Sequence, residues 1–120
     1  MFEILPRSHD GVFGVKATGK ITAKDYEDVL IPKLDDIIEK YGKVRFLYYL
    51  AEEFTGFEPG AMWDDMKYGT GHMDSFERVA VVGGSKWMEW ITKLCGLFTK
   101  NRVRSFKEED LKSAWDWIDA

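Results

Sequence analysis

Few side chains in this sequence are arranged for acid–base chemistry, and the best candidates are pairs of adjacent carboxylates. Glu52-Glu53 follows an apolar run and would stand at the carboxyl end of a strand, the one place where such a pair merits a test. Asp35-Asp36 and Asp64-Asp65 are predicted to lie on helices, where adjacent side chains point in different directions, so both are interpreted as solvated surface. We expect no catalytic residues, and an enzyme using Glu52 or Glu53 is the least supported hypothesis.

Metal-binding and nucleophilic side chains are also sparse. His9 is predicted in a turn and His72 in a glycine-rich segment without the spacing of a metal motif, so each is interpreted as a solvated surface histidine. Cys95 falls on an apolar helix face and is expected to be inert, because a reactive thiolate needs a polar, electropositive setting. The segment at residues 69–71 lacks the lysine of a phosphate-binding loop. We expect neither a metal nor a cofactor.

Composition and charge restrict the class of protein. The 120 residues, 45% hydrophobic and 32% charged, suit a single globular domain over residues 1–120. The net charge is −4 and the basic residues are scattered, which argues against nucleic acid as a partner. A single cysteine fits a reducing compartment, and neither a signal peptide nor an apolar run of about 18 residues is visible. We expect a cytoplasmic protein that contacts a membrane only from its surface.

Periodicity and turn residues predict strands that alternate with helices. Residues 2–5 and 11–18 are apolar runs around a turn with an Asp-Gly pair, which predicts an antiparallel hairpin. A helix is predicted from Thr22, as its N-cap, to about Tyr41. Pro32 should kink or restart this helix, because its ring removes a backbone donor and clashes with the preceding turn.

The remaining elements follow the same alternation. The apolar run VRFLYYL at residues 44–50 predicts a central strand covered on both faces, followed by a loop at residues 51–60 (AEEFTGFEPG). Further elements are predicted as helix 61–68, strand 76–82, helix 85–100, strand 103–106 and helix 107–118. The order ββαβαβαβα predicts an α/β fold: a mixed, mostly parallel sheet with an N-terminal antiparallel hairpin and four helices.

The helix predicted at residues 85–100 (SKWMEWITKLCGLFTK) separates its apolar side chains completely from its polar ones. The apolar arc covers about half of the helical wheel, whereas packing on a sheet needs a stripe of only about 100°. Tryptophans beside lysines are typical of a helix at a lipid headgroup boundary. Packing on the sheet, a neighbouring helix or a partner subunit is the commoner alternative. The face that would meet a membrane or a partner comprises Lys86, Trp87, Trp90, Lys93, Leu94, Leu97, Phe98 and Lys100.

A second aromatic group surrounds the carboxyl end of the central strand, where crevices form in open α/β sheets. Beside the Trp-rich helix, these side chains are expected to line a pocket for an apolar ligand. The slightly favoured alternative is that these aromatic side chains form no pocket and are part of a hydrophobic core that continues into the loop. The pocket residues are Tyr48, Tyr49, Phe54, Phe57, Trp63, Met66, Trp87, Trp90 and Ile91.

The order of elements and the stretches VRFLYYL, FERVAVVGGSKWMEWITKL and VRSFKEEDLKSAWDWI resemble the SpoIIAA-like family, bacterial relatives of the STAS domain. The resemblance spans essentially the whole chain and implies the STAS/SpoIIAA-like fold. In anti-sigma-factor antagonists a phosphorylatable serine follows the central strand. The matching region here offers only Thr55 as a weak equivalent, which counts against a kinase-controlled switch. The family also resembles lipid-binding CRAL-TRIO domains, which implies an apolar ligand or a membrane surface.

Two functions from different classes follow from these patterns. The first is a non-enzymatic domain that binds an apolar or amphipathic small molecule or lipid. It would associate reversibly with a membrane, at the periphery of the inner membrane, through its Trp-rich helix. The second is a STAS-type protein–protein interaction or regulatory module, in which the same helix docks on a protein partner or on a second copy in a homodimer.

Overall fold

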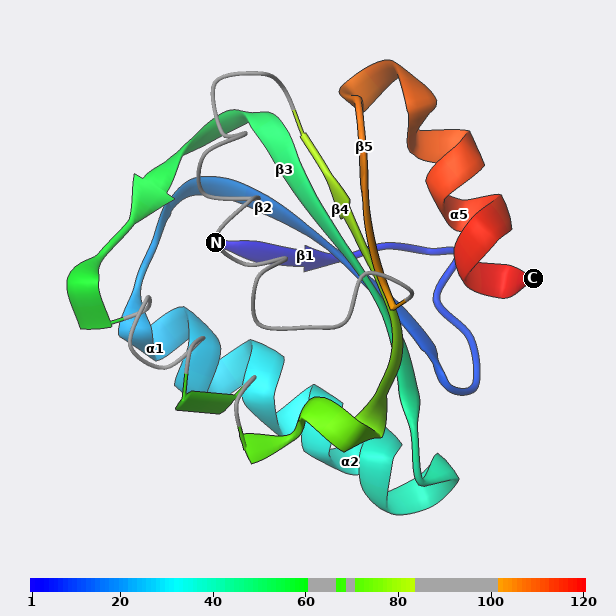
Figure 1. Cartoon of the computed structure of the whole chain (residues 1–120). Coiled ribbons are helices and arrows are strands. Elements are labelled where there is room, and N and C mark those ends of the chain that lie inside the picture. Colours follow the sequence, from blue (N-terminus) through cyan, green and yellow to red (C-terminus); the bar gives the residue numbers. More distant parts are fainter. Residues whose placement is uncertain (61–66, 69–70, 84–101) are drawn as a thin grey trace.

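The computed structural model describes residues 1–60, 67–68, 71–83 and 102–120. In this part of the chain five strands form one mixed sheet in the spatial order β1-β2-β3-β4-β5 (Figure 1). β1 pairs antiparallel with β2, and the other neighbours pair parallel, so the predicted hairpin and mostly parallel sheet are confirmed. The strands are β1 (Phe2–Ile4), β2 (Val12–Ile21), β3 (Val44–Phe57), β4 (Phe76–Val82) and β5 (Val103–Phe106).

The prediction of a loop at residues 51–60 is wrong, because β3 continues to Phe57. β2 supplies the partner for this extension. Its register with β3 shifts around Gly19, whose φ is 63°, and the pairing then continues to Ile21↔Phe57. β4 pairs only with the first part of β3, so the extension is a two-stranded ribbon that bends away from the rest of the sheet (Figure 1). We call this ribbon, residues 19–21 and 51–57, the flap.

The first helical segment begins at the predicted N-cap. The Thr22 hydroxyl accepts a hydrogen bond from the Asp25 amide at 3.1 Å, and the Asp25 carboxylate accepts one from the Thr22 amide at 2.9 Å. The segment then runs through α1 (Ala23–Asp25), the π-helix η1 (Tyr26–Leu30) and α2 (Ile31–Tyr41). Pro32 in the first turn of α2 has no amide hydrogen for the preceding turn, which explains why the helix widens there. The backbone stays right-handed helical at Leu30 and Ile31, so Pro32 marks a change from π to α hydrogen bonding and not a break in the helix.

Helices cover both faces of the sheet. Figure 1 shows α1 and α2 on one side and α5 (Leu111–Asp119) on the other. β2 illustrates the division, because Phe13 and Val15 join the core cluster under α2 whereas Val12 joins the cluster under α5. Gly14 also faces α5, and an added Cβ there would stand only 2.4 Å from the Trp115 ring. The sequence therefore needs a glycine where the terminal helix crosses β2.

Part of the predicted helical content lies outside the described residues. The helix expected at 85–100 and most of the one expected at 61–68 fall there, so the count of four helices stays a prediction. A short 3-10 turn, η2 (Met73–Ser75), precedes β4, and η4 (Glu108–Asp110) leads into α5 as the expected terminal helix. Within the ranges given above, no helix is long and apolar enough to cross a membrane.

Candidate functional site

Three of the predicted pocket residues lie together on the α2 side of the sheet. The ring centroids of Phe54 and Phe57 are 4.9 Å apart, and those of Tyr48 and Phe57 are 6.4 Å apart. Phe2 from β1 and Tyr26 from η1 join them, with ring centroids 5.4 Å apart. We call these five residues the aromatic cluster. Tyr48 and Phe54 are each only 1% exposed, so in this conformation the cluster is continuous with the core.

The aromatic cluster contains a buried pair of hydroxyl groups. The Tyr26 and Tyr48 hydroxyl oxygens lie 2.7 Å apart and form a hydrogen bond. Tyr26 is the first residue of η1, so the π-helical turn that precedes Pro32 sets the position of its ring against the sheet. Such turns are frequent at functional sites. In the sequence, Pro32 indicates that the helix is irregular near Tyr26. The contact of Tyr26 with Tyr48 depends on the register of the sheet, which the local sequence does not reveal.

Tyr49 does not join the other predicted pocket residues, because alternate side chains of a strand point to opposite faces. It packs on the α5 side, and its hydroxyl donates a hydrogen bond to Glu108 at 3.0 Å. Burial and this carboxylate, with further negative charge from Glu53 and Glu52, raise the pKa of Tyr49 to about 12. Glu52 and Glu53 themselves are exposed on the flap.

The remaining predicted site residues divide into two groups. Thr55 is exposed and lies within β3, not at the start of a helix, so its surroundings differ from those of the family phosphosite. The others lie outside the described residues, and their roles in a pocket or on a membrane-facing surface stay predictions: Trp63, Met66, Lys86, Trp87, Trp90, Ile91, Lys93, Leu94, Leu97, Phe98 and Lys100.

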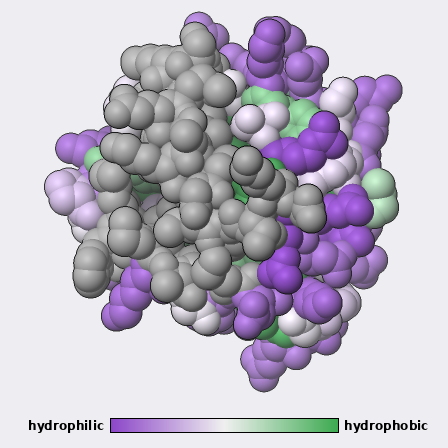
Figure 2. Space-filling model, in the orientation of Figure 1, coloured by the Kyte–Doolittle hydropathy of each residue, from purple (hydrophilic) through white to green (hydrophobic). Residues whose placement is uncertain are grey.

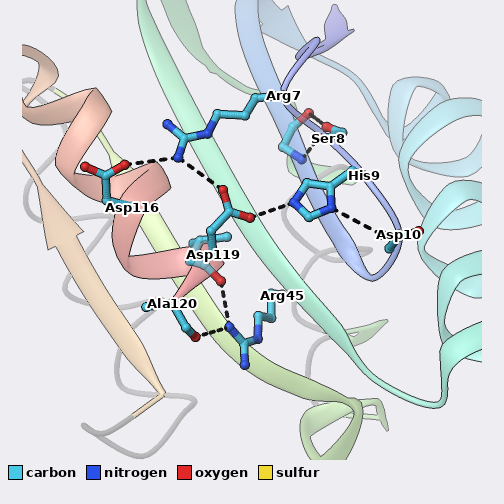
Figure 3. A network of polar contacts seen from close by, with 10 residues as sticks. Arg7, Ser8, His9, Asp10, Arg45, Asp116, Asp119 and Ala120 are labelled. Carbon is cyan, nitrogen blue, oxygen red and sulfur yellow. Dashed lines mark hydrogen bonds and ion pairs between the residues drawn. The ribbon is translucent and has the colours of Figure 1, made fainter.

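A polar network that the sequence analysis missed joins the β1–β2 turn to the end of α5 (Figure 3). Arg7 contacts the carboxylates of Asp116 and Asp119 at 3.0 and 3.1 Å, and His9 Nε2 lies 2.7 Å from Asp119 Oδ1. Arg45 of β3 binds backbone carbonyls at the same end of the helix. The His9 side chain is 54% exposed, as a surface histidine should be, but it is also ion-paired.

The network shifts the pKa values of both partners. The hydrogen bond with Asp119 is the main reason why the pKa of His9 is raised above 6.5, with a further contribution from Asp10. Burial pulls the pKa of Asp119 upward, but the hydrogen bond and charge of His9, with those of Arg7, outweigh this effect and lower it below 3.8. Each charged group therefore stabilises the charged form of the other.

The second histidine also has a local partner. His72 stacks on Tyr68 with ring centroids 4.0 Å apart, and its Nδ1 lies 3.0 Å from the Tyr68 carbonyl oxygen. Tyr68 in turn donates a hydrogen bond to Asp35 at 2.8 Å, and burial together with this carboxylate raises the pKa of Tyr68. These contacts hold Tyr68 and His72 against α2. Across the ranges that the structure describes, no group of three His, Cys, Asp or Glu side chains is placed to hold a metal ion.

Two shallow depressions border the polar network, with volumes of about 440 and 280 Å³. His9, Val12 and Tyr41 line both of them, at the amino ends of β2 and β3. Ligands of open α/β sheets bind at the opposite, carboxyl ends of the strands. We therefore assign a structural role to this network and take the aromatic cluster as the candidate site. Figure 2 shows that hydrophilic residues predominate on the described surface in the orientation of Figure 1.

Comparisons with known proteins agree with the fold and the arrangement of elements. A family model described as SpoIIAA-like matches residues 12–119. Among solved structures, the chain is similar to an uncharacterized protein of the DUF3478 family from Shewanella loihica PV-4, whose crystal structure has a SpoIIAA-like fold. The identity is 33%, the match covers 98% of this chain and 92% of that one, and the TM-score is 0.72. No curated protein matches. The chain belongs to the SpoIIAA-like family.

Proposed function

We propose that this protein is a non-enzymatic domain that binds an apolar or amphipathic small molecule at the aromatic cluster, between the flap and η1. The observation that carries the proposal is the Tyr26–Tyr48 hydroxyl pair inside a group of aromatic rings. Small-molecule sites are mostly apolar and contain a few polar groups that orient the ligand. The aromatic rings would contact the apolar body of the ligand, and the hydroxyls would bind a polar end.

The flap supplies a means of access to the cluster. Its β3 half carries Phe54 and Phe57, and the described strands pair with it only through β2. Two-stranded ribbons are marginally stable without further packing. Gly19 and Gly56 have φ values of 63° and 136°, which other residues adopt only with strain. The backbone of the flap therefore favours glycine at these two positions. Movement of the flap would expose Phe54, Phe57 and the hydroxyl pair together.

Paired removal of the hydroxyls tests the small-molecule site. Tyr26→Phe with Tyr48→Phe keeps the ring volumes and removes both members of the hydrogen bond, a change that is nearly neutral for stability when both partners go. The matched control is Tyr49→Phe, which removes a hydroxyl from the next residue on the opposite face. Native mass spectrometry of the purified proteins would detect a bound molecule, and titration with palmitate and with hexadecanol would measure affinity.

We expect the wild type and Tyr49→Phe to bind an apolar probe equally. The double variant should bind about tenfold more weakly, the loss expected for one or two ligand hydrogen bonds. Thermal melts of all three proteins show whether the double variant stays folded. Equal affinity in the double variant and the control would refute the assignment of the site, and the absence of binding to any probe would refute the small-molecule function.

The membrane part of the proposal depends on residues 86–100 and is tested separately. The support is the sequence pattern, in which Trp87 and Trp90 share an apolar arc that is flanked by lysines. Flotation with anionic liposomes would compare the wild type with Trp87→Asp plus Trp90→Asp. We expect the wild type to float and the variant to stay in the aqueous fractions. Equal flotation of the two proteins, or none in either, refutes membrane association without affecting the ligand site.

A further inference from the structure

Three arginines lie on neighbouring strands beneath the carboxyl end of α5. Arg45 of β3 donates to the carbonyls of Ile118 and Ala120 at 2.9 and 2.6 Å, and Arg78 of β4 donates to the carbonyl of Trp117 at 2.6 Å. Cations at this position satisfy the free carbonyls of the last turn and interact favourably with the helix dipole. Helix capping therefore accounts for Arg45 and for one N–H group of Arg78.

The third arginine is not explained by capping. Arg104 of β5 is exposed, and its guanidinium carbon lies 5.2 Å from the centre of the Phe106 ring and 5.4 Å from that of Trp117. Arg78 lies 5.3 Å from the centre of the same Trp117 ring. A guanidinium that lies over an aromatic face keeps its N–H donors in its own plane, where they can bind a carboxylate at the edge. We call Arg78, Arg104, Phe106 and Trp117 the Arg–Trp patch.

Four carboxylates of adjacent elements have other partners. Glu77, next to Arg78 in β4, binds Arg45, and Glu108 accepts the Tyr49 hydroxyl. Asp116 and Asp119 of α5 both bind Arg7, and Asp119 also binds His9 (Figure 3). No ion pair joins Arg78 or Arg104 to any carboxylate of the described residues. Within the described part of the chain, both guanidinium groups are thus available to a carboxylate from outside.

We propose that the Arg–Trp patch binds an acidic segment of a partner protein. Carboxylates of the segment would accept paired hydrogen bonds from the Arg104 guanidinium and from the free N–H groups of Arg78. The half-buried rings of Phe106 and Trp117, whose centroids are 6.0 Å apart, would together offer an apolar surface to a side chain of the segment. Two arginines fall short of the four to eight basic residues typical of a membrane-binding patch, which favours a peptide.

The patch lies on the α5 side of the sheet, whereas the aromatic cluster lies on the α2 side. Binding of an acidic segment is therefore a second activity, independent of the small-molecule site. The tests are also independent, because no residue is shared between the patch and the cluster.

The experiment uses a labelled pentapeptide with two glutamates on each side of a phenylalanine, followed by fluorescence anisotropy. Arg104→Ala is the test variant, because an exposed side chain can be removed without disturbing the core. Lys112→Ala removes an exposed cation from α5 and serves as the matched control. We expect the wild type and Lys112→Ala to bind equally, Arg104→Ala to bind about tenfold more weakly, and affinity to fall as salt is added. In the wild type the indole N–H NMR signal of Trp117 should shift on titration.

Several results would overturn the proposal. Binding of the same peptide with glutamine in place of glutamate would show that charge is not recognised. Unchanged affinity of Arg104→Ala would place the peptide elsewhere. Displacement of the peptide by inorganic phosphate at equal concentration would show a simple anion contact, and displacement by phosphatidylserine vesicles would assign the patch to membrane. Absence of binding at millimolar peptide would exclude an acidic segment of this kind.

Discussion

Gly14→Ala tests the packing of α5 against the sheet most directly. The added methyl carbon would stand 2.4 Å from Cη2 and 2.6 Å from Cζ2 of Trp115, far closer than the ordinary contact distance of about 3.5–4.0 Å. Trp115 is 5% exposed and packs between β2 and the rest of α5, so its ring has little freedom to move aside. The clash must therefore shift the helix or force the indole from its preferred rotamer.

The expected cost follows from two opposing effects. Overpacking of this kind costs about 1–3 kcal/mol, and replacing glycine by alanine recovers about 0.4–1 kcal/mol by restricting the unfolded chain. We expect a net loss of about 1–2 kcal/mol, which lowers Tm by about 4–8 °C in a domain of this size. Urea unfolding followed by circular dichroism would measure the free energy. Gly11→Ala is the control, because an added Cβ there meets its nearest neighbour, the Lys43 carbonyl oxygen, at an ordinary 3.5 Å.

A second substitution tests whether the cost of Gly14→Ala comes from its contact with the Trp115 ring. Trp115→Phe lacks the two ring atoms that the new methyl group would meet, so Gly14→Ala should cost at least about 1 kcal/mol less in that background. A cost for Gly14→Ala within about 0.5 kcal/mol of zero would refute the argument, since that is the range of a neutral surface change. The same would follow if the cost were equal in the two backgrounds, because then Trp115 would not be the source of the clash.

Two further predictions concern the capping box and the polar network. Thr22→Ala should lower the free energy of unfolding by about 1 kcal/mol through loss of the N-cap, whereas Thr22→Ser should retain most of it; equal stability of the Ala and Ser variants would contradict the capping role. Because the pKa of His9 is raised in the folded state, its pairing with Asp119 stabilises the protein fully below the unfolded pKa of about 6.5. This stability is lost as pH rises through the higher folded value. Thermal melts of wild type and His9→Gln should thus differ most below about pH 6.5 and converge as the pH is raised, and a difference that does not change with pH would disprove the linkage.

Local patterns were sufficient to predict much of the fold. Thr22 and Asp25 form the capping box, and Gly42, with φ of 79°, ends α2 in the left-handed conformation that favours glycine. These features depend on neighbours within a few residues, which is why the sequence alone reveals them.

Features that depend on distant partners were missed. The glutamates and glycine of residues 51–57 favour a loop, but pairing with the bulged end of β2 extends the strand through them. Phe54 and Phe57 were the available signal, because aromatic residues suit a half-buried strand. The contact of His9 with Asp119 spans almost the whole chain, and nothing in the local sequence of either residue indicates it. The candidate site was predicted in part: Tyr48, Phe54 and Phe57 lie together, but Tyr49 faces the other side.

The spatial order of the five strands repeats their order along the chain, and this has a consequence for assembly. Each strand joins the edge left by its predecessor, so the sheet can grow one neighbour at a time from the amino-terminal hairpin. Among the described elements, α5 crosses back over the sheet to reach Gly14 and the turn at His9. Because α5 takes no part in any strand pairing, the loss of its contacts would leave every ladder of the described sheet intact.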